Sequence, residues 1–159
     1  MRLRRLEDAD HDAVRRILLA AYADHLAVEA DYRSELTDVA RRDREAEVWV
    51  AEDDDGAVVG TVTVCPPDSP WREIARQGEG EFRMLAVDPA RQGEGLGRAL
   101  TRLVVDELDR RGDRAVVLSS TDTMHTAHRL YESLGFVREP ERDWKPNPEV
   151  SLLAYRKDL

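Results

Sequence analysis

The sequence has little cysteine and no long apolar run. Cys65 has no second thiol to pair with, which excludes an intramolecular disulfide and any multi-cysteine metal cluster. We expect it to be a small buried apolar residue. No apolar run approaches the roughly 20 residues that span a bilayer, so we expect no membrane-spanning helix. The amino terminus lacks the apolar segment of a secretory signal, and we expect a cytoplasmic protein.

Positive charge is also scarce. Lysine and arginine together number 24 against 33 aspartates and glutamates, which gives a net charge of −9. This balance argues against nucleic-acid binding and favours a cationic partner such as an amine. Lys145 and Lys157 are the only lysines, a bias that indicates a GC-rich, bacterial genome. The histidines show no zinc-like spacing, and we predict no metal.

The 159 residues are 42% hydrophobic and 36% charged, which is typical of a single globular domain over residues 1–159. Periodicity predicts strands and helices in the order β-α-α-β-β-β-α-β-α-β-β, an α/β fold with a mixed central sheet. About six to seven strands and about four helices are expected. The strands are predicted at 1–6, 47–52, 57–65, 81–87, 114–120, 136–139 and 150–159. The helices are predicted at 8–31, 35–42, 96–111 and up to residue 134.

A glycine-rich stretch, "LAVDPARQGEGLGRAL", leads from a strand through an Asp-Pro turn into a helix. Unpaired N–H groups and the helix dipole at such a place bind anions, usually phosphate. The stretch is no Walker loop, because Arg-Ala follows its third glycine, and its G-x-G-x-G spacing is not the dinucleotide fingerprint. The glycines alone are equally compatible with a simple turn.

The pattern Gln92-x-x-Gly95-x-Gly97 after an apolar strand resembles the pyrophosphate-binding signature of the GCN5-related N-acetyltransferases, the GNAT family. "EFRMLAVDPARQGEGLGRAL" is similar to the family's fourth strand and following helix, and "AHRLYESLGF" to its second signature. The element order agrees over nearly the whole chain. The resemblance implies a GNAT-like fold and transfer of an acetyl group from acetyl-CoA to a primary amine, by direct attack in a ternary complex.

The same resemblance implies where acetyl-CoA binds, between the separating ends of the fourth and fifth strands. Backbone N–H groups of the glycine loop would hold the pyrophosphate, and the fourth strand would bond the pantetheine arm. The Leu85 N–H would stabilise the charge on the thioester oxygen. The implied cofactor-binding residues are Leu85, Ala86, Val87, Gln92, Gly93, Glu94, Gly95, Leu96, Gly97 and Arg98. Met124 stands where many members have asparagine, and either Thr123 or His125 would replace that contact.

Tyr131 matches the family's general acid. A phenol with a pKa of about 10 is a plausible proton donor to a departing thiolate. The alternative is packing, because Met124, Ala127, Tyr131 and Leu134 form an apolar stripe at helical spacing.

Glu81 matches the glutamate that many members use as the base. Alternation along a strand predicts that Glu81, Arg83, Leu85 and Val87 share one face. A solvated carboxylate paired with Arg83 is the alternative, and ordered water would then be the base.

The resemblance also implies that the acceptor contacts the region of residues 22–33 and the loop "ERDWKPNP". Tyr22, Tyr32, Asp143 and Trp144 are the acceptor-side candidates. Tyr32 and Trp144 would form an apolar or cation-binding wall, and Asp143 would hold an ammonium group. The acceptor is expected to be a small-molecule or peptide amine.

Two other functions are compatible with the sequence. A catalytically silent module would bind acyl-CoA and regulate another protein, and a nucleotide-binding protein would prefer ATP or NAD to CoA. The presence of both Glu81 and Tyr131 favours the enzyme. Members of the family often dimerise, and we expect a homodimer.

Overall fold

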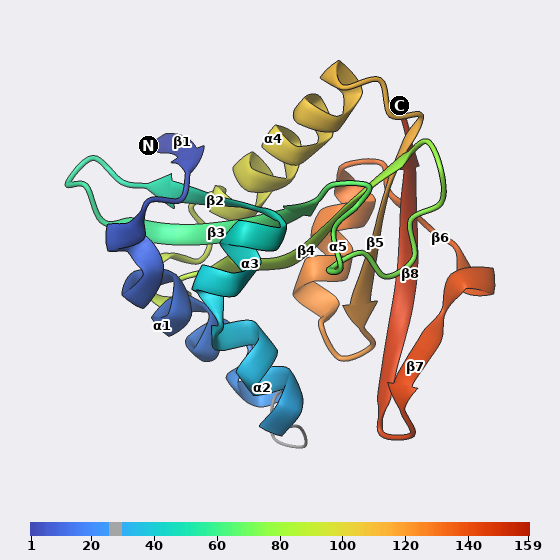
Figure 1. Cartoon of the computed structure of the whole chain (residues 1–159), viewed down its shortest axis with the longest axis horizontal. Coiled ribbons are helices and arrows are strands. Elements are labelled where there is room, and N and C mark those ends of the chain that lie inside the picture. The colour runs from blue at the N-terminus through green and yellow to red at the C-terminus, as the bar shows by residue number, and fades with distance from the viewer. Residues whose placement is uncertain (26–29) are drawn as a thin grey trace.

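The computed structural model describes residues 1–25 and 30–159, which form a mixed β-sheet with helices on both faces (Figure 1). The strands are β1 (Arg2–Arg5), β2 (Glu47–Glu52), β3 (Val58–Cys65), β4 (Glu79–Val87), β5 (Ala115–Thr121), β6 (Val137–Arg138), β7 (Trp144–Asn147) and β8 (Val150–Asp158). The α-helices of this described part are α1 (His11–Ala21), α2 (Ala30–Thr37), α3 (Val39–Glu45), α4 (Leu96–Arg110) and α5 (His125–Ser133). Short 3-10 turns lie at Asp8–Asp10, Ala23–His25, Pro89–Arg91 and Pro140–Arg142. None of these helices is both long and apolar enough to cross a membrane.

The strand order is β1-β2-β3-β4-β5-β8-β6, with β7 paired to β8. Strands β4 and β5 are parallel, and all other neighbours are antiparallel. The parallel pair is joined only from Glu79–Ala115 to Glu81–Val117. Beyond that point the carboxyl ends of β4 and β5 are not paired with each other, and the sheet opens there.

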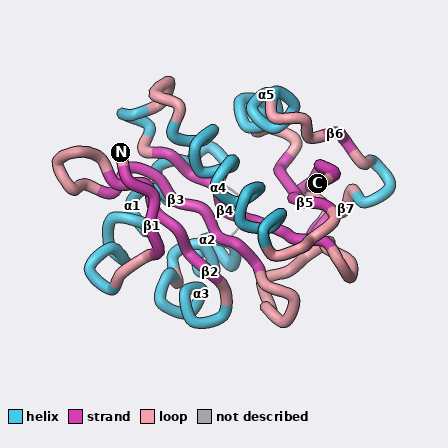
Figure 2. Tube along the Cα trace, turned by 90° about the horizontal axis from the view of Figure 1, so that it is seen from above, coloured by secondary structure: helices cyan, strands magenta, loops and turns pink. Residues whose placement is uncertain are grey.

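Two apolar cores lie on opposite faces of the sheet. Helices α1 and α3 cover one face of the sheet (Figure 2). On this face Ile17 and Val39 belong to the same buried apolar cluster as Val48 of β2. Helix α4 covers the other face, where Leu100 packs with Phe82 of β4. The apolar residues of α1 and α4 recur every three or four positions, so each helix buries one side against the sheet.

The predicted mixed α/β fold is confirmed, with three differences in detail. The helix predicted at 35–42 is divided at Asp38 between α2 and α3, so the described residues contain five α-helices where about four are expected. The sheet has eight strands in the described residues, because Trp144–Asn147 forms β7 where the sequence predicts a loop. The helix predicted over 8–31 ends as α1 at Ala21. Apolar residues continue at helical spacing beyond Ala21, so periodicity alone cannot locate that end. The part of this prediction at residues 26–29 lies outside the described residues.

Strand β4 contains a bulge that the sequence pattern does not predict. Two residues of β4, Met84 and Leu85, stand opposite one residue of β3. Met84 has φ of 55°, uncommon for a residue other than glycine. The extra residue reverses the alternation, so Arg83 lies on the face of α1 and α3 while Leu85 packs on the face of α4. The prediction that Glu81, Arg83, Leu85 and Val87 share one face is therefore wrong.

Candidate active site

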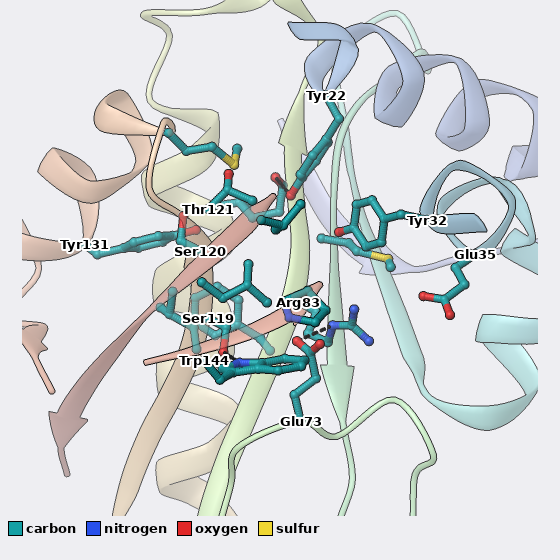
Figure 3. Close-up of a pocket in the computed structure, with 18 residues that line it drawn as sticks. Tyr22, Tyr32, Glu35, Glu73, Arg83, Ser119, Ser120, Thr121, Tyr131 and Trp144 are labelled. Carbon is teal, nitrogen blue, oxygen red and sulfur yellow. Dashed lines mark hydrogen bonds and ion pairs between the residues drawn. The ribbon is translucent and has the colours of Figure 1, made fainter. Parts of the chain in front are cut away.

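A cavity of about 290 Å³ lies where β4 and β5 separate. The end of β4 supplies one wall with Arg83 and Leu85, and Ser119 and Ser120 of β5 supply the facing wall. The side chain of Tyr131 enters from α5 (Figure 3). The opening of the sheet thus exposes strand backbone to a space that a ligand can enter.

The glycine loop connects the end of β4 to α4. Gly93 and Gly95 have φ of 86° and 81°, a left-handed conformation that glycine adopts without a steric penalty, and Gly95 caps the helix. A Cβ atom at either glycine would meet no atom within 4 Å, so this face of the loop is open to a ligand. The first amides of a helix have no partner within the helix, which fits the expected contact with a pyrophosphate.

Two arginines near this loop are engaged by the protein itself. Arg91 pairs with Glu94 at 2.9 Å and with Asp53 of the β2–β3 turn at 2.7 Å. Arg98, an expected phosphate ligand, donates to Ser133 Oγ at 2.8 Å. Arg91 therefore ties the loop to the neighbouring hairpin, while Arg98 joins α4 to α5.

Tyr131 lines the cavity and belongs to a cluster of aromatic rings. Its ring lies 5.9 Å from that of Phe82 and 5.8 Å from that of Phe136, in edge or tilted contact. Burial raises the pKa of its hydroxyl, which therefore stays protonated at neutral pH. Among the described residues no protein group forms a hydrogen bond with this hydroxyl. The Tyr131 ring packs in the core, as the second alternative predicts, and the residue also borders the cavity, so its role as an acid stays a prediction.

Glu81 is completely buried and does not line the cavity. Its carboxylate accepts hydrogen bonds from the backbone N–H groups of Glu73, Ile74 and Ala75 at 3.0, 3.0 and 2.8 Å. The Glu81 carboxylate is therefore hydrogen-bonded to the loop before β4. It does not face the cavity in which the acceptor amine is expected to bind.

A different carboxylate faces the cavity. Glu73, in the loop between β3 and β4, lines it and pairs with Arg83 Nε at 3.0 Å. Burial raises the pKa of Glu73 to about 7, and the attraction of Arg83 offsets this only in part. Glu35 of α2 is a second acid in the lining. Sequence reasoning missed Glu73 because it lies in an irregular connection with no periodic signal.

Three of the four acceptor-side candidates line the cavity. Tyr22, Tyr32 and Trp144 lie around it (Figure 3). The Tyr22 hydroxyl donates to the Leu85 carbonyl at 3.2 Å, and Trp144 Nε1 donates to Ser119 Oγ at 3.2 Å.

Asp143 is not among the lining residues. Its carboxylate accepts from both terminal nitrogens of Arg138, at 2.8 and 2.7 Å, and from the Ala154 N–H at 2.8 Å. These bonds lower the pKa of Asp143 and hold β6 and β8 to the intervening turn. The geometry therefore does not support the prediction that this residue holds an ammonium group.

The described residues that line the cavity provide no activated nucleophile. Cys65 lies outside the lining, is fully buried, and has its pKa raised to about 12. Ser120 is 3.2 Å from His128 Nε2, but that nitrogen is also 3.0 Å from the Thr121 carbonyl oxygen. A carbonyl can only accept, so Nε2 carries the proton and cannot take one from Ser120. Nor do His, Cys, Asp and Glu gather as a metal site within this described part.

Comparison with known proteins points to one family. The family model "Acetyltransferase (GNAT) family" matches residues 11–136. Mycothiol acetyltransferase of Cellulomonas flavigena is 32% identical over 142 residues, covering 81% of this chain and 38% of that protein. Mycothiol acetyltransferase of Thermomonospora curvata is 35% identical over 135 residues, covering 81% of this chain and 41% of that protein. The chain thus spans about two fifths of the length of these curated relatives.

Solved structures are also similar. One from Salmonella typhimurium, which contains acetyl-CoA as its cofactor, superposes with a TM-score of 0.67 at 26% identity. The alignment covers 99% of this chain and 93% of the other. The shared fold therefore extends over essentially the whole described chain.

Proposed function

This chain belongs to the acetyltransferase (GNAT) family, and from this premise we propose that it transfers an acetyl group from acetyl-CoA to a primary amine. The observations that carry the proposal are the cavity between the separated ends of β4 and β5, and the open glycine loop that follows β4 at the start of α4. A thioester bound there would lie between backbone of β4 and the side chain of Tyr131.

The residues at this site fit acetyl-CoA. The backbone amides of Gln92 to Arg98 would hold its pyrophosphate at the positive end of α4. The backbone of Leu85 to Val87 would bond the pantetheine arm, and the Leu85 N–H would stabilise negative charge on the thioester oxygen. The bulge at Met84 supports this role, because it interrupts the regular pairing of β4 with β3 at this position.

Tyr131 is proposed as the acid that protonates the departing thiolate. The absence of an activated serine or cysteine from the described lining favours direct attack of the amine in a ternary complex over an acyl-enzyme. As the carbon–nitrogen bond forms, the carbon–sulfur bond breaks, and the sulfur takes a proton. The products are an amide and free CoA.

A small-molecule amine is the proposed acceptor. Two relatives carry the name mycothiol acetyltransferase, and the cavity is lined by aromatic rings and two carboxylates. Such a lining suits a cation with an apolar body. A peptide amine remains the second kind of acceptor to be tried.

Release of free thiol from acetyl-CoA tests the proposal. We expect thiol release only when an amine is added. The amines to compare are an arylalkylamine, a polyamine, and peptides with a free amino terminus or a lysine. Acetyl-CoA binding without release by any amine would instead support the silent regulatory module. Thermal protection by ATP or NAD but not by CoA would support a nucleotide-binding protein.

Replacement of Gly95 by alanine tests the glycine loop. The left-handed backbone costs an alanine about 1 kcal/mol, and the new methyl group would occupy the open face of the loop. We expect the affinity for acetyl-CoA, measured by calorimetry, to fall about tenfold, an estimate equal to about 1.4 kcal/mol.

The matched control is Gly112→Ala, at the other end of α4. Gly112 also has a positive φ, of 90°, and a Cβ atom there would meet no atom within 4 Å. This variant should lose about the same stability without losing affinity. Equal affinities in the two variants would contradict the assignment of the loop.

A further inference from the structure

The loop before β4 carries an acid into the cavity. The Glu73 side chain is 16% exposed and points from the loop toward Arg83 and the space beside Trp144 (Figure 3). The cavity lining holds two acids, Glu35 and Glu73, against one cation, Arg83, in the described residues. The net charge of the lining is therefore negative when both acids are ionised, which favours an ammonium ligand over an anionic one.

Hydrogen bonds to Glu81 hold the loop that carries Glu73. The Glu81 carboxylate binds the N–H groups of three successive residues, Glu73 to Ala75. Arg83 binds the loop a second time, because its Nη1 donates to the Trp71 carbonyl at 3.1 Å. Without the buried carboxylate, three backbone donors would lose their acceptor, and the loop that carries Glu73 would have to rearrange.

The charges around Glu73 suit proton transfer near neutral pH. Burial raises the pKa of Glu73 most, Arg83 of β4 lowers it, and Glu81 of β4 and Glu35 of α2 raise it further. Tyr32 of α2 faces the same space and stays neutral, because burial raises its pKa. A base that titrates close to the working pH is suited to take a proton from a bound ammonium.

We propose that Glu73 binds the ammonium group of the acceptor and takes its proton, and that Glu81 is a positioning residue that holds the Glu73 loop. This inference rests on the proposed acetyl transfer. One proton passes from nitrogen to the Glu73 carboxylate, and the neutral amine attacks the thioester carbon. As the carbon–sulfur bond breaks, the nitrogen loses a second proton. The sulfur gains one proton in the same step, so this step releases none. One proton is released per amide formed.

The test compares Glu73→Gln with Glu81→Gln, using 2-phenylethylamine as the probe because it has no carboxylate. In the wild type, kcat/KM should rise with pH through about 7 as Glu73 loses its proton. Glu73→Gln should remove this rise and lower kcat/KM at least tenfold, an estimate at the low end for a lost base. Glu81→Gln keeps one amide oxygen as an acceptor for the loop N–H groups, so it should lower kcat/KM but keep the rise. The rise should move to lower pH, because the negative charge of Glu81 that raises the pKa of Glu73 is gone.

Binding of 2-phenylethylamine to the CoA-loaded protein gives a readout that needs no turnover. Calorimetry should show at least tenfold weaker amine binding for Glu73→Gln, with CoA affinity unchanged. The control Asp68→Asn removes an exposed carboxylate from the same loop and should alter neither measurement. A Glu73→Gln variant with the wild-type pH profile or amine affinity overturns the inference. The inference is also overturned if the rise of kcat/KM with pH disappears in Glu81→Gln but not in Glu73→Gln. Failure of every amine to release thiol would refute the acetyl transfer, while the binding comparison would still decide whether Glu73 binds the ammonium group.

Discussion

Replacement of Tyr131 by phenylalanine is expected to lower kcat about 100-fold while the affinity for acetyl-CoA stays within about twofold. Only the hydroxyl is removed, so the ring keeps its contacts with Phe82 and Phe136. Loss of the proton donor makes expulsion of the thiolate slower without weakening binding of the ground state. Thiol release under saturating acetyl-CoA and amine measures kcat, and calorimetry measures the affinity.

Tyr155→Phe is the matched control for this variant. Tyr155 belongs to the same ring cluster, 6.0 Å from Tyr131, but does not line the cavity. Its replacement should leave kcat within about threefold of the wild-type value. A Tyr131→Phe variant with kcat close to that of this control would show that Tyr131 only packs in the core. That is the alternative indicated by its place in the apolar stripe of its helix.

Replacement of Glu79 by glutamine is expected to lower the free energy of unfolding by about 3–5 kcal/mol. Glu79, at the start of β4, is fully buried. It accepts from Arg142 Nη1 and Nη2 at 2.7 and 2.9 Å, from the Arg76 N–H at 2.8 Å, and from Arg156 of β8. The amide would leave Arg142, which is 5% exposed along its side chain, with only the less buried Glu139 as its counter-charge among the described residues. Urea unfolding followed by circular dichroism measures the change.

Asp12→Asn is the control for Glu79→Gln, since it breaks an exposed pair. Asp12 lies 2.7 Å from Arg15 with its side chain 96% exposed, and its loss should cost less than about 1 kcal/mol. A cost for Glu79→Gln as small as that of the control would contradict the role of the buried pair.

The pH dependence of stability provides a second check on Glu79. Arg142 is the main cause that lowers the pKa of Glu79 from 4.5 to about 2. A lowered pKa means that its stabilising contribution is present above about pH 4.5 and is lost as the pH falls toward 2. The wild type should therefore lose more stability than Glu79→Gln over this interval.

Local patterns in the sequence predict much of this protein. The hairpin of β2 and β3, with Asp-Asp-Asp-Gly at its turn, and the strand, glycine loop and helix of residues 79–110 follow the expected order. The sequence also predicts Tyr131 as a site residue, and Tyr131 borders the cavity. These features depend on residues close together in the chain, where spacing and turn chemistry act directly.

The assignment of the acids could not be predicted in the same way. The sequence predicts Glu81 and Asp143 as site residues, but backbone N–H groups bind both carboxylates, and Arg138 also binds that of Asp143. Glu73 lies in a connection whose course depends on what it packs against. Whether a carboxylate faces a cavity or binds the backbone depends on residues brought near it by folding, and one sequence position does not contain that information.

By itself, then, the sequence determined the α/β element order and the acetyltransferase resemblance, because both depend on the spacing of residues close together in the chain. Only the tertiary structure decided that β4 carries a bulge, so that Arg83 and Leu85 face opposite sides of the sheet. It also decided that Glu73 faces the cavity while Glu81 holds its loop. The physical reason is the same in both cases: one extra residue in a strand, or one loop folded onto a buried charge, changes which side chains meet without changing any local pattern.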